Sequence, residues 1–514
     1  MKQAIQRNID VLAFAAAIAA YFLSQGIINI LQADPVGFHF IRQTDSLSFA
    51  DTYACSNYPF LEPHTWNLTS DGGKAACEFP LLYALAAQCY SLTGPSPLVL
   101  RLMVFIISFA GFISLYAFMR RMTGNRAIAF PLALLCMSST VVIHYASVPM
   151  VDGAALGFTL TGLNLAHRGR VPGASAMWTL TGILAFTLGA LLKVTFAIVP
   201  LAWMLSECPA WWQRISSTTS SYPRSTQVWT ALVTTAGCAA VVAWYCYARS
   251  YNAVAGDSYF LTAPRHLLAL DKQAILDVLD AIAHRWKQAW YTNETWWLVA
   301  ASGALCIWKW KHMQPGVAVK VALAVAGTLT YAFLFFGQFS DHDYYFLPLV
   351  PVVAMVLAAV PYTTILPDRS GLRILGWMAI TACTFSSLIY ATGKWHKRYA
   401  QPETMYSELP MSLAVIKHEA AAMAGNRPVV IIGDLTRNGS LYVLKKPGYT
   451  FPTWEAWLDF SARTPTGEAM IIARNVPADK QVLARPLGES SGWWAIDYQG
   501  MTRRTDQPVR NTTR

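Results

Sequence analysis

The sequence predicts a polytopic α-helical membrane protein that ends in a small α/β domain. Charged residues make up 13% of the 514 residues and hydrophobic residues 54%, whereas a soluble chain carries roughly a quarter of its residues as charges. Long apolar segments alternate with short basic loops, and the chain becomes polar again after about residue 393. These three observations indicate that most of the chain lies in lipid.

The apolar segments approach the length that crosses a bilayer, for which about 20 residues are needed. The first, VLAFAAAIAAYFLSQGIINI, reaches this length without a charge. We count about eleven spans, of which some are short enough to leave the count open by one or two. They lie near residues 11–31, 98–119, 127–145, 153–167, 175–191, 194–206, 228–247, 295–309, 317–337, 345–361 and 373–392.

The loops between alternate spans are short and basic, as in RRMTGNR and HRGR. Basic loops stay in the cytoplasm, so we expect a cytoplasmic N-terminus and a membrane module over residues 1–393. The other side then holds long loops at 32–97 and 248–294 and a soluble domain at 394–514. The net charge of +11 belongs to these loops and forms no basic block with interleaved aromatics, so no nucleic-acid partner is expected.

The predicted outer segments contain further helices and strands. FPLLYALAAQCYSL fits a helix on the membrane surface, SLSFADTYA a second helix, and DKQAILDVLDAIAHRWKQAW has the apolar spacing of an amphipathic helix. In the C-terminal domain, RPVVIIGD, EAMIIARN and WWAIDYQ predict strands, and PTWEAWLDFSA predicts a helix. VVIIGDLTRNGS lacks the glycine spacing of a nucleotide site, so none is assigned.

The nine cysteines show no C-x-x-C spacing, and most lie within predicted spans. Cys55 and Cys77 both fall in the first outer loop. In an oxidising periplasm they can form a disulfide. The alternative is a pair of free thiols, and the sequence leaves both open.

Polar residues gather on the predicted outer side, where ionisable groups near a membrane are candidates for function. Asp45 lies in RQTDS, three residues after Arg42. Asp45 can serve as a helix N-cap before Ser46, or as a general base in a cleft that excludes water. Arg42 can pair with Asp45 or hold a phosphate.

Three further outer segments carry candidate polar residues. Glu78 and Tyr83 in EFPLLY can begin an interfacial helix with a tyrosine in the aromatic belt, or can lie on the rim of a cavity. Asp152 begins a span from the outer side, which is favourable to the helix dipole, and is also a site candidate. Lys193 lies at an outer turn, where it can snorkel or bind a lipid phosphate.

The segment SDHDYYFLPLVP places Asp341, His342, Asp343, Tyr344 and Tyr345 at the outer start of a span. Tyrosines alone would form an ordinary aromatic belt. Two acids and a histidine beside them indicate a site. A metal site would need a second His or Cys at ligand spacing, and none follows in this segment, so no metal is assigned.

These motifs, in this order and on one side, resemble the bacterial members of glycosyltransferase family 39. The family belongs to the GT-C clan, with the protein O-mannosyltransferases and the lipid A aminoarabinose transferases. The resemblance covers roughly residues 10–392 and rests on RQTDS, EFPLLY, Asp152, the LLK turn and HDYYFLPLVP. It implies a GT-C fold, a bacterial inner membrane and a periplasmic C-terminal domain.

The resemblance also implies a polyprenyl-phosphate-sugar-dependent glycosyltransferase that inverts the anomeric carbon without a catalytic metal or another cofactor. Asp45 would deprotonate the acceptor hydroxyl. Arg42, Lys193 and His342 are the candidates for binding the donor phosphate. Glu78, Tyr83, Asp152, Asp343, Tyr344 and Tyr345 would bind sugar or shape the cavity.

The acceptor is expected to be a cell-envelope glycan or glycolipid, or else a protein. The better-known protein mannosyltransferases have an Asp-Glu pair after the first span, whereas Ser46 follows Asp45 here, which weakens the case for a protein acceptor. A transporter or flippase of a lipid-linked glycan is the alternative, although such proteins show internal repeats and none is evident. A non-catalytic membrane scaffold is a third possibility, and it would tolerate loss of Asp45.

Overall fold

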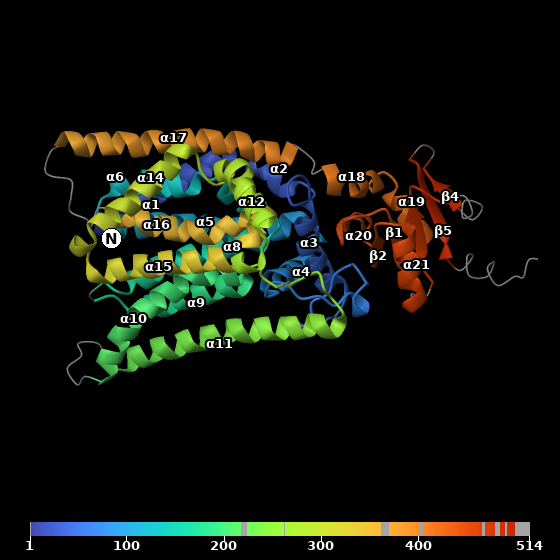
Figure 1. Cartoon of the computed structure of the whole chain (residues 1–514), viewed down its shortest axis with the longest axis horizontal. Helices are drawn as coiled ribbons and strands as arrows, with labels where there is room; N and C mark the ends of the chain where they lie inside the picture. Colours follow the sequence, from blue (N-terminus) through green and yellow to red (C-terminus); the bar gives the residue numbers. More distant parts are fainter. Residues whose placement is uncertain are drawn as a thin grey trace, which may run out of the picture. The chain divides into compact units, whose positions relative to one another are not determined.

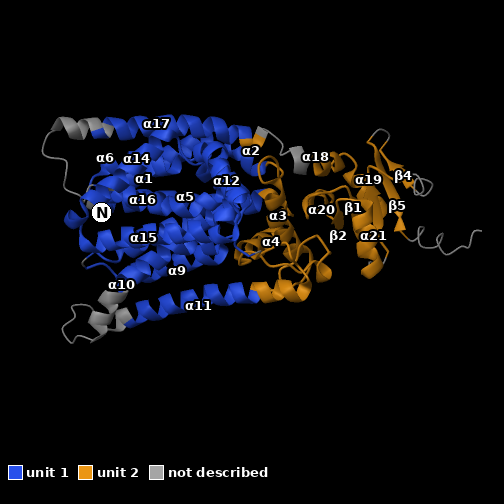
Figure 2. Cartoon of the chain, in the orientation of Figure 1, with its two compact units in different colours: residues 1–32, 98–247, 262–397 blue, residues 33–97, 248–261, 398–514 orange. Residues whose placement is uncertain are grey.

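The computed structural model describes residues 2–171, 173–216, 224–261, 263–360, 370–400, 404–464, 468–477, 484–488 and 491–498 (Figure 1). The chain divides into two compact units (Figure 2). Unit 1 comprises residues 1–32, 98–247 and 262–397, and unit 2 comprises residues 33–97, 248–261 and 398–514. The first outer loop therefore packs with the C-terminal segment, whereas the sequence assigned it to the membrane module.

Unit 1 is helical, and each of the eleven predicted spans contains a helix. Its helices run roughly along one direction in Figure 1. Two long helices, α11 and α17, continue from unit 1 into unit 2. The helices are α1 (Lys2–Ser24), α2 (Ile27–Gln32), α5 (Pro97–Thr123), α6 (Arg126–Met137), α7 (Thr140–Tyr145), α8 (Val151–Arg168), α9 (Ala176–Leu192), α10 (Ile198–Ser216), α11 (Arg224–Ala255), α12 (Lys272–Asp280), α13 (Lys287–Trp290), α14 (Asn293–Trp308), α15 (Pro315–Leu334), α16 (Val350–Ala359) and α17 (Ser370–Ala400).

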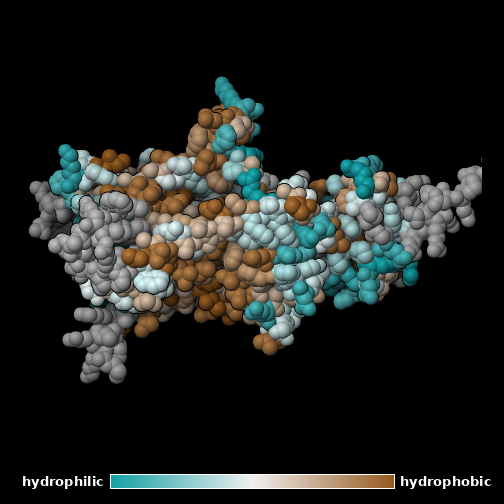
Figure 3. Space-filling view, turned by 90° about the horizontal axis from the view of Figure 1, so that it is seen from below, coloured by the Kyte–Doolittle hydropathy of each residue, from teal (hydrophilic) through white to brown (hydrophobic). Residues whose placement is uncertain are grey.

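Among the described residues, three helical segments are long and apolar enough to cross a membrane: Pro97–Thr123, Val228–Ala255 and Pro315–Leu334. Five shorter apolar helical segments accompany them, including Ala176–Leu192 and Asp343–Ala359. On the face shown in Figure 3, hydrophobic side chains cover much of unit 1. The apolar surface agrees with a membrane location, and the total of about eleven spans stays a prediction.

Helices α8 and α9 form a close antiparallel pair in unit 1. A Cβ on Gly182 of α9 would lie 2.6 Å from the backbone nitrogen of Ala166 on α8. A Cβ on Gly189 would lie 2.8 Å from the Thr159 hydroxyl oxygen. Small residues let membrane helices approach this closely. The pairing sets Asp152, at the start of α8, beside Lys193, which follows the end of α9.

Unit 2 combines helices of the first outer loop with an α/β fold. The predicted helices of the loop are present, as is the one beginning at Trp454. The strands near residues 448 and 484 were not predicted. The elements are α3 (Phe40–Cys55), α4 (Leu81–Thr93), α18 (Thr404–Leu413), α19 (Lys417–Ala424), β1 (Val429–Ile432), α20 (Gly439–Leu444), β2 (Gly448–Phe451), α21 (Trp454–Arg463), β3 (Met470–Ala473), β4 (Ala484–Leu487) and β5 (Trp493–Asp497).

The five strands form a mixed sheet in the order β2-β1-β3-β5-β4. Strand β1 is parallel to β2 and β3, and β5 is antiparallel to β3 and β4. One face packs against the buried Trp457 of α21. Asn67 of the outer loop forms a parallel bridge with Gly448, at the edge strand. A Cβ at Gly448 would lie 2.0 Å from the Val429 carbonyl oxygen, so glycine permits this close pairing.

Candidate active site

Helix α3 of unit 2 carries Arg42 and Asp45, the two charged residues of the RQTDS motif, on one face. The helix begins at Phe40, after His39 in the left-handed region with φ of 58°. Asp45 therefore lies inside the helix, and the prediction that it could be an N-cap is wrong. Residues three apart on a helix are neighbours, and an Nη1 atom of Arg42 lies 3.5 Å from Oδ2 of Asp45.

Asp45 is 1% exposed, and two neutral hydrogen-bond donors and the Arg42 guanidinium surround its carboxylate. The side-chain amide of Asn438 donates a hydrogen bond to Oδ1 at 2.7 Å. The Tyr259 hydroxyl donates to Oδ2 at 3.3 Å. The arginine contact at 3.5 Å is longer than a direct hydrogen bond. The carboxylate is thus oriented from two sides.

Burial raises the pKa of Asp45, while Arg42, Asn438, Arg437 and Tyr259 act in the opposite direction. The net shift is upward because removal from water penalises the charged form. Burial and the nearby Asp45 carboxylate also raise the pKa of Tyr259, so this phenol remains a hydrogen-bond donor. A carboxylate with a raised pKa is a stronger base than an ordinary aspartate.

Arg42 is fixed by the segment that precedes α4. Its Nη2 atom donates to Oε1 of Glu78 at 2.7 Å and lies 3.4 Å from the Cys77 sulfur. The Tyr83 hydroxyl donates to the other oxygen of Glu78 at 3.2 Å. Glu78 is 6% exposed and Tyr83 1%. The two predicted substrate residues therefore support Arg42 from within the protein.

Of the two alternatives that the sequence left open for Cys55 and Cys77, the structure has the pair of free thiols. Cys77 lies beside Arg42 near the start of α3, whereas Cys55 ends that helix. Thirteen residues of helix separate the Cα atoms of Arg42 and Cys55 by roughly 20 Å, whereas a disulfide needs Cα atoms within about 7 Å. Burial also raises the pKa of the Cys77 thiol to about 12, so it stays protonated.

A second arginine of unit 2 lies near the same carboxylate. Arg437 forms an ion pair with the buried Asp257. Its guanidinium lies 5.3 Å from the ring centroid of Phe260, and that of Arg42 lies 5.5 Å from the same ring. Two cations therefore flank one aromatic ring beside Asp45. This arrangement lowers the cost of negative charge nearby.

Asn438 links Asp45 to the outer loop and the sheet. Its side-chain oxygen accepts hydrogen bonds from the Ser48 hydroxyl at 3.4 Å and from the backbone N–H of Asn67 at 3.1 Å. The amide orientation is therefore set by three partners. Asn438 is 0% exposed, so this network is sequestered from water.

Sequence reasoning missed Arg437, Asn438, Asp257 and Tyr259. The first two lie in VVIIGDLTRNGS, for which the glycine spacing predicts no nucleotide site. The available signal was the polar TRN segment after a buried strand, because loops at the ends of core strands often carry function. Asp257 and Tyr259 had no comparable signal, since they lie in the loop that follows α11.

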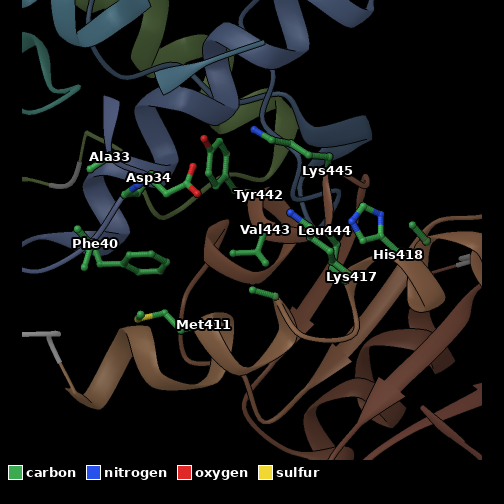
Figure 4. Close-up of a pocket in the computed structure, with 14 residues that line it drawn as sticks. Ala33, Asp34, Phe40, Met411, Lys417, His418, Tyr442, Val443, Leu444 and Lys445 are labelled. Atoms are coloured by element: carbon green, nitrogen blue, oxygen red, sulfur yellow. The ribbon is translucent and has the colours of Figure 1, made fainter. Parts of the chain in front are cut away.

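Unit 2 also contains a cavity of about 530 Å³ lined by residues 33–36, Phe40 and parts of α18, α19 and α20. In Figure 4, Phe40 and Met411 lie toward one end of it, and Lys417 and His418 toward the other. Lys445 also lines it and forms an ion pair with Asp51 of α3 at 2.7 Å. The cavity contacts the first turn of α3 and does not include Asp45.

Unit 1 holds a separate group built on Asp152 and Lys193. The Lys193 ammonium lies 2.7 Å from an Asp152 oxygen, and the exposed fractions of the two side chains are 13% and 2%. The same ammonium lies 4.2 Å from the centroid of the Tyr344 ring. The structure thus brings three of the predicted residues together. Asp152 and Lys193 neutralise each other directly.

The HDYY segment packs around this group. His342 stacks on Tyr344 with ring centroids 4.8 Å apart, and Tyr345 lies 4.9 Å from Tyr344. Asp343 is 0% exposed and accepts a hydrogen bond from the Tyr145 hydroxyl at 2.8 Å. The segment therefore presents an aromatic cluster with a buried acid and a histidine. No group of three metal-ligating side chains occurs among the described residues.

No protein family and no curated protein matches the sequence. Solved structures do match. ArnT from Cupriavidus metallidurans in the apo state has a TM-score of 0.60 at 13% identity, covering 95% of this chain and 97% of that one. The same protein bound to undecaprenyl phosphate gives a TM-score of 0.59 at 12% identity, covering 94% of this chain and 98% of that one.

The archaeal oligosaccharyltransferase AglB from Archaeoglobus fulgidus, in complex with an inhibitory peptide and a dolichol-phosphate, also matches. Its TM-score is 0.51 at 10% identity, covering 91% of this chain and 70% of that one. At these identities the likeness establishes the fold. The GT-C fold that the sequence motifs implied is confirmed.

Proposed function

We propose that this protein is an integral-membrane glycosyltransferase of a bacterial inner membrane. It would move a sugar from a polyprenyl-phosphate donor to an acceptor hydroxyl on the periplasmic face, with inversion. The observation that carries the proposal is Asp45, a carboxylate 1% exposed that neutral donors orient and no cation contacts at less than 3.5 Å among the described residues. A directly neutralised carboxylate would be a poor base.

In the proposed reaction Asp45 takes the proton of the acceptor hydroxyl. The hydroxyl oxygen attacks the anomeric carbon with its lone pair, and the bond from that carbon to the phosphate oxygen breaks. Polyprenyl phosphate leaves with the bonding electrons. The leaving phosphate needs charge stabilisation more than a proton, and Arg42 is the cation of unit 2 that we assign to it.

Lys193 and His342 of unit 1 are assigned to the donor phosphate, as the motifs implied. Asp343, Tyr344 and Tyr345 would bind the sugar. Asp152 is assigned to positioning Lys193, since their atoms lie 2.7 Å apart. Glu78 and Tyr83 would position Arg42 through the contacts at 2.7 and 3.2 Å. Positive side chains supply the charge in this scheme, so no metal ion or other cofactor is invoked.

Two points support this proposal over a flippase. A solved protein of the same fold that is bound to dolichol-phosphate is an oligosaccharyltransferase, which is an enzyme of glycan transfer. A flippase would have no use for a buried carboxylate oriented as a base. We propose a cell-envelope glycan or glycolipid as the acceptor, because the Asp-Glu pair of the protein mannosyltransferases is absent.

The test is sugar transfer by the purified full-length protein in detergent, with a panel of polyprenyl-phosphate sugars and envelope glycolipid acceptors. We expect the wild type to transfer one sugar of the panel. The Asp45→Asn variant should lose about a thousandfold in kcat, within the range of general-base contributions. Donor binding should persist in that variant.

The matched control is Asp51→Asn, which removes a second buried carboxylate from the same helix. Asp51 is 2% exposed and pairs with Lys445, outside the proposed machinery. Its activity should remain near that of the wild type. Equal activity in Asp45→Asn and wild type would refute the assignment of the base. Specific donor binding without any turnover in the wild type would favour the flippase.

A further inference from the structure

Unit 1 contains a second polar region at the other end of α8 and α9 from Asp152 and Lys193. Arg168 lies sixteen residues after Asp152 on α8, roughly 24 Å along the helix axis. A pocket of about 820 Å³ opens at this end. It is lined by Arg120, Arg121, Gly124, Arg126, Arg168, Val171, Gly173, Ala174, Ser175 and Trp178. Four of these ten residues are arginines, and none is acidic.

Two of the four arginines are held by neutral groups. Arg121 donates to the side-chain oxygen of Asn164 and to the Ala117 carbonyl. The Arg168 guanidinium lies 3.5 Å from the centroid of the Trp178 ring. Within the part of the chain that the structure describes, no carboxylate is at ion-pair distance from Arg121 or Arg168. A guanidinium fixed by neutral contacts keeps donors and full charge for a ligand.

The neighbouring cations are different, which makes these two stand out. Arg120 and Arg126, which also line the pocket, share Asp10, at 2.7 and 3.7 Å. Arg170 and Lys320 share Glu207, at 2.5 and 2.9 Å. Among these described cations, Arg121 and Arg168 are therefore the two that no carboxylate neutralises at ion-pair distance.

Basic loops alone would explain surface charge on this side. They would not explain a hollow that four arginines line, one of them stacked on an aromatic ring. Arginine clusters of this kind suit phosphate, because the planar fork matches two phosphate oxygens. The distance of roughly 24 Å from Asp152 approaches the hydrocarbon thickness of a bilayer, about 30 Å. With Asp152 at the outer membrane surface, as the sequence predicts, a pocket this far along α8 is expected at the level of the lipid headgroups of the other leaflet.

We propose that this pocket binds the phosphate of an anionic phospholipid headgroup, in the leaflet at the end of unit 1 that carries the basic loops. Arg121 and Arg168 are the main ligands, with Trp178 fixing Arg168. Basic pockets between membrane helices bind such headgroups. The site is separate from the Asp152–Lys193 group, so it requires no part in sugar transfer.

Lipid binding to the purified full-length protein in detergent, measured by native mass spectrometry, tests this proposal. The probes are phosphatidylglycerol and phosphatidylcholine, titrated separately. The wild type should bind phosphatidylglycerol more tightly. The Arg121→Gln/Arg168→Gln double variant should weaken that binding about thirtyfold and leave phosphatidylcholine unaffected.

The matched control is Lys309→Gln/Lys311→Gln, which removes the same charge from a basic loop between α14 and α15. Its phosphatidylglycerol affinity should match the wild type. Equal weakening in both double variants would show a general charge effect and overturn the pocket. If the Gln variant does not fold, the Arg121→Lys/Arg168→Lys variant serves in its place. It keeps the charge but loses the planar guanidinium that matches two phosphate oxygens, so it should still bind phosphatidylglycerol more weakly than the wild type. An unchanged phosphatidylglycerol affinity in that variant would refute the site.

A second arm separates a lipid from a soluble source of the phosphate. Inorganic phosphate at millimolar concentration is added to the wild type with phosphatidylglycerol bound. We expect the lipid to stay bound, because its chains add apolar contacts. Displacement by inorganic phosphate would assign the pocket to a soluble phosphate and overturn the lipid assignment.

Discussion

Asp45 in unit 2 and Asp152 in unit 1 are both buried carboxylates, and their surroundings differ. Asp152 touches an ammonium at 2.7 Å. The Asp45 carboxylate accepts hydrogen bonds from the Asn438 amide at 2.7 Å and from the Tyr259 hydroxyl at 3.3 Å, and the Arg42 guanidinium lies 3.5 Å away. The first arrangement neutralises a charge in an apolar setting. The second orients a carboxylate without neutralising it by direct contact.

The contrast separates a carboxylate that positions a cation from a carboxylate that can take a proton. A buried ion pair is costly to break, because one charge then remains without compensation. Burial raises the pKa of Asp45 despite its hydrogen-bond donors and the nearby arginines, so this carboxylate can accept a proton. The predictions below test this distinction in order of the expected effect.

Breaking the pair in unit 1 should give the largest loss of stability. Lys193→Met leaves Asp152 charged and buried, and we expect a cost of about 3–5 kcal/mol in the free energy of unfolding. Thermal unfolding in detergent measures the change. The Asp152→Asn/Lys193→Met double variant should recover most of the loss. If the loss of stability in the double variant equals the sum of the losses in the two single variants, the two residues act independently.

Removing the amide partner of Asp45 should have an intermediate effect, mainly on activity. Asn438→Ala deletes the donor at 2.7 Å and should lower transfer about ten- to hundredfold near neutral pH. The base must be ionised, so kcat/KM rises with pH through the pKa of Asp45. The Asn438 amide favours the charged form of Asp45, so its loss should raise the pKa of Asp45. The rise of kcat/KM on the acid side should therefore move to higher pH.

The control for Asn438→Ala is Ser48→Ala, which loses a contact with Asn438 and keeps the bond from Asn438 to Asp45. Its pH profile should match the wild type. A lowered rate with an unshifted acid limb in Asn438→Ala would show a packing role instead of an effect on Asp45.

Asp45→Asn should have the smallest effect on stability, with a sign opposite to that of Lys193→Met. Because burial raises the pKa of Asp45, its folding contribution is present at low pH and is lost as pH rises through the folded-state pKa. The asparagine variant should therefore unfold at a higher temperature than the wild type at neutral pH. The gain should vanish in acid, where the wild-type carboxyl is protonated. A loss at neutral pH would show that Arg42 and Arg437 outweigh burial.

Local patterns predicted much of the fold. Apolar segments of membrane length became helices, and the alternating and continuous apolar runs near residues 429, 470 and 493 became strands. Strand β2, GYTF, was missed because four residues beginning with glycine carry little periodicity. Strand β4, ARPL, was missed because its Pro and Arg disfavour a strand, and pairing with β5 overrides that preference.

The site was predicted in part for the same reason. Arg42 and Asp45 are neighbours by helical spacing, and Glu78 and Tyr83 lie five residues apart. Local sequence was therefore enough to predict each pair as site candidates. The pairing of Asp45 with Asn438 joins positions 393 residues apart. The sequence left a Cys55–Cys77 disulfide open, because sequence distance does not tell which end of α3 each cysteine lies near.

The sequence by itself determined the apolar helical segments, the resemblance to a GT-C fold and the ionisable residues that are candidates for the site. These depend on residue type and short-range period, which one chain displays directly. Only the tertiary structure decided which cation neutralises which carboxylate. That choice depends on contacts between distant segments and on burial, and a group's charge state follows from its three-dimensional surroundings.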